Sequence, residues 1–277
     1  AVKTELQFEE EVEVSSDGGE PTGDEPSQPL KKKVVIKEKK VAVEEEEEAS
    51  EDPVILTTIK GKAIDGYLEG STVFVDANGD GVLSAGERAF VTKAKGVYEF
   101  TLEGAAGGSI IITGGIDTHG FAFSGTMSAP EGSTVVTPFT TLLDNGASNE
   151  LIATALGIPN NIDFTTYDFI EESKSSQEGQ EVWEAATRMV NIASQISAVV
   201  DPDDKSPNAD AAVYKAIVET LKGEDLSGGT SVEFIENVIA SAIDSGVTGE
   251  SGAGGSISVQ ESIASNDLVA TLIINSD

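Results

Sequence analysis

The chain has 277 residues, no cysteine and a formal net charge of −32 at pH 7. The charge argues against a nucleic-acid partner, since nucleic acid is itself a polyanion, and the lack of cysteine excludes disulfides, thiolate metal sites and cysteine nucleophiles. No apolar run approaches the length of a bilayer-spanning helix, so we expect no membrane insertion.

Residues 1–52 form a charged N-terminal arm. They contain 17 acids against 7 lysines, and the charges come in blocks, among them Lys31 to Lys33 and Glu44 to Glu48. Such a composition predicts disorder. However, Leu6 and Phe8 alternate with polar residues, and Val34 to Ile36 is strongly β-prone. We therefore expect these segments to pair as strands on a neighbouring subunit.

The sequence pattern of residues 53–140 is typical of a β-domain. Short β-prone runs cover residues 54–59, 62–64, 71–75, 89–92, 97–102, 109–113 and 120–124, with glycine pairs between several of them. Several short strands at close spacing predict an antiparallel β-sandwich. Because helical patterns follow it, we expect an α+β fold.

The sharpest chemical motif is the loop from Asp76 to Glu87, which matches D-x-[DN]-x-[DN]-G-x5-E at every constrained position. Such a loop supplies oxygen ligands to Ca²⁺ from its positions 1, 3, 5, 7, 9 and 12. The predicted metal ligands are Asp76, Asn78, Asp80, Glu87, the main-chain carbonyl of Val82 and Ser84, the last often through a water. Gly81 occupies the sixth position, where the chain must turn sharply. The alternative is a polar Asx–Gly turn in an acidic protein.

The flanks of this loop decide what kind of calcium site it is. Residues 71–75 before it and 88–92 after it are short and rich in β-branched and aromatic residues, so the loop joins strands rather than helices. Without helices to open, a sensor role is not expected. We predict a structural site whose folding and ion binding are coupled.

Two stretches resemble known protein segments. Residues 66–81, with Gly86, Glu87 and residues 96–100, resemble the calcium-binding B-type Ig-like (prealbumin-like) domains of bacterial surface proteins. Residues 113–117, 125–130 and 135–143 are similar to a segment of large exported proteins of marine bacteria and of virion proteins of their phages. The first resemblance implies an Ig-like sandwich in which Ca²⁺ rigidifies a stalk. The chain differs from adhesin arrays in having a single copy of this domain.

Helical signals dominate residues 141–246, which we expect to form a small helical bundle. Four helices are predicted, over 150–156 after the cap Ser148–Asn149, over 180–200, from Asn208 to Leu221, and from Thr230 to Gly246 with Glu233 in a capping box. Residues 247–277 are predicted to be a linker followed by C-terminal strands. A helix over residues 256–277 remains the alternative to the strand pair.

An enzyme is not expected. No G-x-S-x-G, P-loop, G-x-G-x-x-G or H-E-x-x-H pattern is present. The single histidine, His119, is expected to lie in a turn. We expect Trp183 to pack on or near the apolar stripe of its helix, and Tyr167 and Tyr214 to lie on helical segments.

These features together predict a non-enzymatic, calcium-stabilised structural subunit of an exposed assembly, either a bacterial surface fibre or a virion appendage. Its expected partners are copies of itself or another structural subunit, joined through terminal strands. The alternative is a secreted carbohydrate- or protein-binding adhesin module, with a cell-surface receptor or glycan as partner. An extracellular, cell-surface or virion location is expected, because salt there screens the self-repulsion of an acidic chain. For the start at Ala1 two explanations stay open: removal of a signal, or removal of only an initiator methionine.

Overall fold

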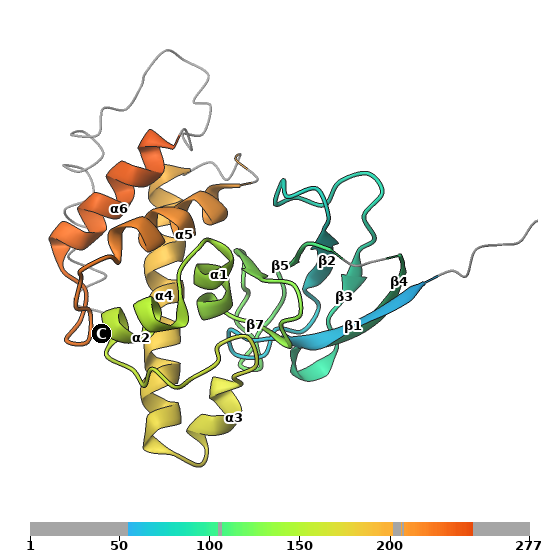
Figure 1. The fold of residues 1–277 in the computed structure, drawn as a ribbon, viewed down its shortest axis with the longest axis horizontal. Coiled ribbons are helices and arrows are strands. Elements are labelled where there is room, and N and C mark those ends of the chain that lie inside the picture. Colours follow the sequence, from blue (N-terminus) through green and yellow to red (C-terminus); the bar gives the residue numbers. More distant parts are fainter. Residues whose placement is uncertain (1–54, 105–106, 202–205, 207, 246–277) are drawn as a thin grey trace, which may run out of the picture. The chain divides into compact units, whose positions relative to one another are not determined.

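The computed structural model describes residues 55–104, 107–201, 206 and 208–245. The fold is α+β, with two mostly antiparallel sheets and, among the described residues, six α-helices (Figure 1). The strands are β1 (Leu56–Ala63), β2 (Thr72–Asp76), β3 (Phe90–Val91), β4 (Val97–Glu103), β5 (Ser109–Thr113), β6 (Thr126–Ala129) and β7 (Val135–Val136). The helices are the 3₁₀ turn η1 (Ala94–Gly96), α1 (Pro138–Asp144), α2 (Asn149–Leu156), α3 (Phe169–Ser173), α4 (Gln177–Val200), α5 (Ala209–Thr220) and α6 (Val232–Asp244). The predicted arm (1–52) and the predicted linker and C-terminal strands (247–277) lie outside the described residues.

The first sheet has the order β4-β1-β7, and the second has the order β3-β2-β5-β6. All pairings are antiparallel except that of β1 with β7. In the first sheet Ile59 lies opposite Phe100, and in the second Val73 lies opposite Ile112. Buried side chains of both sheets, among them Tyr98 and Met127, join in one apolar cluster. The sheets are therefore held together by a common core.

The other face of the second sheet turns toward the helices. Phe74 and Ile111 lie opposite each other on β2 and β5; both are buried, and neither belongs to the cluster between the sheets. The helix α1 is fixed to β6 by hydroxyl groups: Thr140 Oγ1 donates to the carbonyl oxygen of Ser128 at 2.8 Å, and Thr141 Oγ1 accepts the N–H of Ser128 at 3.0 Å. Because these groups are buried, the paired hydrogen bonds avoid the cost of leaving polar atoms unsatisfied.

The helices enclose a second apolar cluster. The long helix α4 contacts α3, α5 and α6, and α5 also packs on α6 (Figure 1). The apolar stripe of α4 is buried throughout, as the helical period requires; it consists of Val182, Ala186, Met189, Val190, Ala193, Ile196 and Val200. Residues Ile64 and Val135 from the β-strand part of the chain also join this cluster.

The predicted strands are largely confirmed. The runs 54–59 and 62–64 belong to one continuous strand, β1, and the run 109–113 is β5. The prediction of a strand over residues 120–124 was wrong: these residues form no strand, and Ala122 makes an isolated bridge to Ile116. The sequence also did not lead us to expect strands at β6 and β7. Both are short, with four and two residues, so a period of two has little length in which to appear.

The predicted helices are confirmed, with corrections at their ends. The side chain of Ser148 caps α2, which ends at Gly157 in the left-handed conformation (φ +66°). The cap of α6 is Ser231 rather than Thr230, so the predicted capping box with Glu233 was wrong: Phe234 occupies the third helical position. Asn208 precedes α5 without a side-chain capping bond. Helices α1 and α3 were missed because they have only seven and five residues, too few for an amphipathic pattern.

Candidate metal centre

Asp76 stands at the end of β2, where the strand leads into the predicted calcium loop. Its side chain is buried, whereas most of the loop after it is exposed. Asp76 Oδ1 accepts the main-chain N–H groups of Gly79 and Asp80 at 2.7 and 3.2 Å, and Oδ2 accepts that of Gly81 at 2.8 Å. The first motif position therefore holds the next five residues in a tight curl around one carboxylate.

The carboxylate of Asp80 accepts hydrogen bonds from three more of the predicted ligands. Its Oδ2 accepts hydrogen bonds from Ser84 Oγ at 2.6 Å and Asn78 Nδ2 at 2.8 Å. Its Oδ1 accepts the N–H of Val82 at 2.9 Å. These hydrogen bonds lower the pKa of the Asp80 carboxyl below its ordinary value, because they favour the charged form; the bond from Ser84 has the largest effect. A carboxylate that is ionised at neutral pH thus lies beside an amide and a hydroxyl.

Glu87 closes the loop from its other end. Glu87 Oε1 accepts the N–H of Ala77, and Oε2 accepts the N–H of Ser84, both at 2.9 Å. Both carboxylate oxygens are therefore directed back at the loop. These two bonds tie the twelfth position of the motif to the second and the ninth.

Two glycines make this geometry possible. Gly81 has φ +75°, which confirms the sharp turn predicted at the sixth position. A Cβ on Gly81 would lie 3.1 Å from Asn208 Oδ1, so the loop lies close against the residue that precedes α5. A Cβ on Gly108 (φ +132°) would lie 2.1 Å from the main-chain oxygen of Asp76. Only glycine lets β5 begin so close to the end of β2.

The donor chemistry of the loop fits a hard cation. The six predicted ligands offer oxygen only, from three carboxylates, an amide, a hydroxyl and a carbonyl, which suits Ca²⁺ or Mg²⁺ rather than zinc or copper. Among the described residues, no three carboxylate or histidine side chains are arranged as a metal-binding group. Here each of the three carboxylates, Asp76, Asp80 and Glu87, instead accepts main-chain N–H groups of the loop.

A second pair of acids lies outside the loop, at Asp65 and Asp117. Burial raises the pKa of Asp65 to about 6, and the negative charge of Asp117 adds to this effect. Asp117 Oδ1 accepts the N–H groups of His119 and Phe121, both at 2.8 Å. The ring of His119 is exposed, with Nδ1 3.6 Å from Asp117 Oδ2. His119 therefore lies in a hydrogen-bonded turn, as the sequence predicted.

The aromatic residues singled out in the sequence have different surroundings. Tyr214 is buried on α5, whereas Tyr167 precedes α3 and is not helical. The side chain of Trp183 is 38% exposed and lies outside the helical cluster, so its predicted packing was wrong. Trp183 instead lines a groove of about 700 Å³ between α4 and residues 227–229. Polar side chains of Gln180, Glu184, Thr187, Arg188 and Asn191 line the same groove.

Comparison with known proteins identifies no relative: no family model, no curated protein and no solved structure matches the chain. No helix in the described part of the chain is long and apolar enough to cross a membrane.

Proposed function

We propose that the protein is a non-enzymatic structural subunit of an exposed assembly, a bacterial surface fibre or a virion appendage, stabilised by Ca²⁺. The observation that carries the proposal is the buried carboxylate of Asp76, around which the loop curls through three main-chain hydrogen bonds. The ligands would be Asp76, Asn78, Asp80, Ser84, Glu87 and the carbonyl of Val82. Bound Ca²⁺ would neutralise part of the repulsion among the three carboxylates, which couples binding to folding.

The β-sheet part supports a structural role for the ion. The loop follows β2, a central strand of the second sheet, and that sheet shares its core with the first. The arrangement is compatible with a β-sandwich, and we propose that it is of the Ig-like or prealbumin-like type. An ion bound at the end of a central strand would stiffen both sheets through this core. A location outside the cell, on its surface or on a virion would supply both calcium and charge screening.

Assembly through strand addition is the second part of the proposal. In the first sheet β4 is one of the two outer strands, and in the second sheet β3 is one of them, with Val91 exposed. Outer strands present main-chain groups that an added strand can pair with. The β-prone segments of residues 1–52 and 256–277, which lie outside the described residues, are the strands that we propose a neighbouring subunit receives.

The test is to measure the mass of the full-length protein in solution and to image it in an electron microscope, with Ca²⁺ and with a chelator. We expect filaments or a defined oligomer in Ca²⁺, and loss of the folded form at lower temperature with chelator. A protein that is monomeric at all concentrations, with and without Ca²⁺, would contradict the structural-subunit proposal.

A secreted adhesin module is the second candidate, and the groove of Trp183 favours it. A half-exposed indole ring surrounded by amide, carboxylate and guanidinium groups can stack on an apolar sugar face while polar groups bind hydroxyls. Binding to a glycan panel should then fall at least tenfold in Trp183→Ala, as expected from about 1.4 kcal/mol of lost contact. The control is Phe121→Ala, which removes another exposed aromatic ring, one that is 73% exposed. Equal loss in both variants would refute a specific role of the groove.

A further inference from the structure

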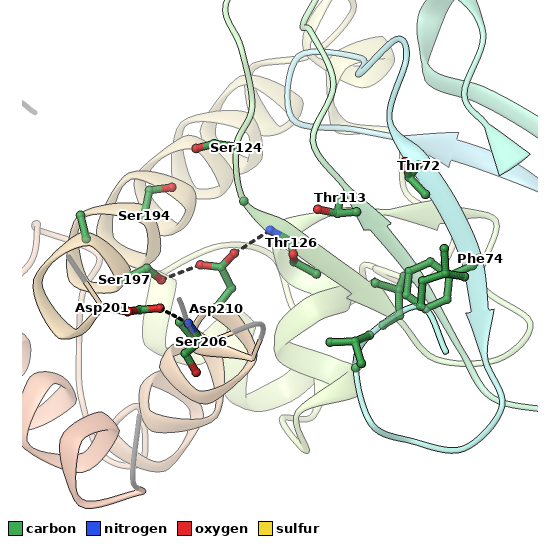
Figure 2. A pocket seen from close by; sticks show the side chains of 17 residues that line it. Thr72, Phe74, Thr113, Ser124, Thr126, Ser194, Ser197, Asp201, Ser206 and Asp210 are labelled. Atoms are coloured by element: carbon green, nitrogen blue, oxygen red, sulfur yellow. Dashed lines mark hydrogen bonds between the residues drawn. The ribbon is translucent and has the colours of Figure 1, made fainter. Parts of the chain in front are cut away.

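A pocket of about 710 Å³ lies between the second sheet and the helices α4 and α5. Figure 2 shows Thr72 and Phe74 on the side of the sheet, with Ser197, Asp201 and Asp210 on the side of the helices. Residues 81–83 of the predicted calcium loop also line this pocket. The volume falls within the range of about 300–1,000 Å³ that small-molecule sites occupy.

Asp201 is the unusual group of this pocket. It follows the last residue of α4, and only 4% of its surface is exposed. Its Oδ2 accepts the main-chain N–H of Ser206 at 2.6 Å, whereas its Oδ1 is buried and has no hydrogen-bond partner in the described part of the chain. A buried carboxylate oxygen without a partner costs free energy unless a donor or a cation reaches it. A positively charged or hydrogen-bonding group that reached Asp201 Oδ1 would therefore stabilise this oxygen.

Asp210 is held in a different way. Its Oδ1 accepts a hydrogen bond from Ser197 Oγ at 2.6 Å, and its Oδ2 accepts the N–H of Thr126 at 2.7 Å (Figure 2). These bonds join α5 to α4 and to β6, which fixes one wall of the pocket. Asp210 thus shapes the site and adds negative charge to it, while Asp201 carries the oxygen that lacks a partner among the described residues.

The opposite wall is apolar in its centre and polar at its margin. Phe74 and Ile111 face the helices from neighbouring strands, and both line the pocket. Hydroxyl groups of Thr72 and Thr113 flank them on the same strands. The pocket therefore combines an apolar patch on the sheet with carboxylates on the helix side.

We propose that this pocket binds a small organic molecule that carries a protonated primary amine, with the ammonium group on Asp201 Oδ1 and the apolar body against Phe74 and Ile111. An ammonium supplies several N–H donors and a positive charge to the oxygen that needs both. A calcium ion is a poorer match for the same position, because it requires six or more oxygens and Asp201 and Asp210 are the only two carboxylates among the described residues that line the pocket. The proposed ligand contacts Asp201, Phe74 and Ile111 are not among the predicted calcium ligands, although Val82 lines the pocket as well.

The test is calorimetric titration of the full-length protein in a buffer that contains no other amine. The probe is phenethylamine, and phenethyl alcohol is the matched neutral compound. We expect the amine to bind about tenfold or more tightly than the alcohol, as a charge-assisted hydrogen bond predicts. N-acetyl-lysine methylamide tests the other source of the same group, a lysine side chain of a protein. Tighter binding of this compound than of phenethylamine would overturn the small-molecule proposal, as would equal binding of the amine and the alcohol.

Variants separate ligand binding from folding. Asp201→Asn keeps an oxygen for Ser206 and removes the charge, so phenethylamine binding should fall about tenfold or more. The control, Asp225→Asn, changes an exposed carboxylate that bonds to Ser227, and binding should be unchanged. Without ligand, the melting temperature of Asp201→Asn should equal or exceed that of the wild type, because the substitution removes a buried charge of which one oxygen has no partner among the described residues. A clear fall would mean that the chain itself already pairs this carboxylate, and it would overturn the proposal.

Discussion

The carboxylate of Asp168 lies 2.7 Å from Lys62 Nζ and so joins the β1 strand to the start of α3. The hydroxyl of Tyr67 donates to the same carboxylate at 2.9 Å. Burial raises the pKa of Tyr67, and this hydrogen bond adds to the effect. Asp168 Oδ1 also accepts the N–H of Glu171 and thereby caps α3. One carboxylate, mostly shielded from solvent, therefore connects the β-strand part of the chain with the helices.

We predict that Asp168→Ala lowers the free energy of unfolding by about 2–4 kcal/mol, the sum of a lost cap and a lost charge-assisted hydrogen bond. The control is Lys174→Ala, which breaks an ion pair of the same 2.7 Å length with Glu171. Since both side chains of that pair are largely exposed, its loss should cost less than about 0.5 kcal/mol. Urea unfolding at pH 7 measures both values. Similar effects of the two substitutions would show that Asp168 is not a central connection.

The calcium loop predicts a stabilisation that depends on the ion. At a hundredfold excess over Kd, Ca²⁺ should raise the free energy of unfolding by about 2.7 kcal/mol. Glu87→Gln should remove most of this gain, because it keeps an oxygen for Ala77 or Ser84 but loses the bidentate charge. Glu103→Gln, an exposed change at the end of β4, should retain the gain. Scanning calorimetry with Ca²⁺ and with chelator makes the comparison. An unchanged wild-type melting temperature in chelator would exclude a calcium site that matters for folding.

Magnesium should bind the same loop more weakly than calcium. A bidentate Glu87 and a carbonyl ligand at Val82 suit about seven oxygens at calcium distances, whereas Mg²⁺ requires a tight octahedron. Titration calorimetry of the full chain with each ion gives the two affinities. Equal affinity would argue that the loop is a general site for divalent cations rather than a calcium site.

Asp65 predicts a specific dependence of stability on pH. Its folded pKa of about 6 lies above the ordinary value of 3.8, so between these values the folded protein binds more protons than the unfolded one. The contribution of Asp65 to stability therefore becomes less favourable as the pH rises from about 4 through 6. Ionised Asp65 at pH 7 costs about 1–3 kcal/mol, because each tenfold change in an acid dissociation constant corresponds to about 1.4 kcal/mol.

Replacing Asp65 tests this directly. Asp65→Asn should be more stable than the wild type at pH 7, and the difference should vanish near pH 4. Urea unfolding across this range measures it. Asp225→Asn is a control for which the stability should change in the opposite direction, since hydrogen bonds from Ser227 lower the pKa of Asp225. A difference for Asp65→Asn that does not change with pH would show that the carboxyl does not titrate in this window.

The long amphipathic elements were predictable because their periods repeat. The stripe of α4 extends from Val182 to Val200, which is enough turns for the helical pattern to stand out. Ser148 and Gly157 mark the ends of α2 by chemistry that is local to the chain. The sharp turn at Gly81 was likewise expected, since the sixth position of the motif requires it, whereas the hydrogen bonds that Asp76 accepts from the loop were not predicted.

The pocket could not be predicted, because its residues come together only through packing. Phe74 and Asp201 are far apart in the sequence, and nothing in the pattern around Asp201 distinguishes it from the many other acids. The placement of Trp183 was also missed, since a residue next to the apolar stripe of a helix can turn either way. Contacts between distant elements, unlike periods and caps, leave no signal in a single sequence.

The strand-donor hypothesis makes a final prediction about residues 1–52. Ordering some fifty residues costs on the order of 1 kcal/mol or more each, which short strands cannot recover alone. Strands laid on a neighbour's outer strand would gain main-chain hydrogen bonds and would bury Leu6, Phe8 and the run Val34 to Ile36. The arm should therefore be required for assembly and not for the calcium-dependent fold that follows it.

Deletion of residues 1–52 separates these two requirements. We expect a folded monomer that is still stabilised by Ca²⁺, whereas the full-length chain assembles; light scattering and calorimetry measure the two properties. A full-length variant with Val34, Val35 and Ile36 each changed to lysine is the matched control, because it keeps the length of the arm and removes its most β-prone run. This variant should also be monomeric, since charged side chains oppose burial against a sheet. If both altered proteins still form the native assembly, the arm donates no strand, and subunits must join through surfaces of residues 55–245 or through the C-terminal segment.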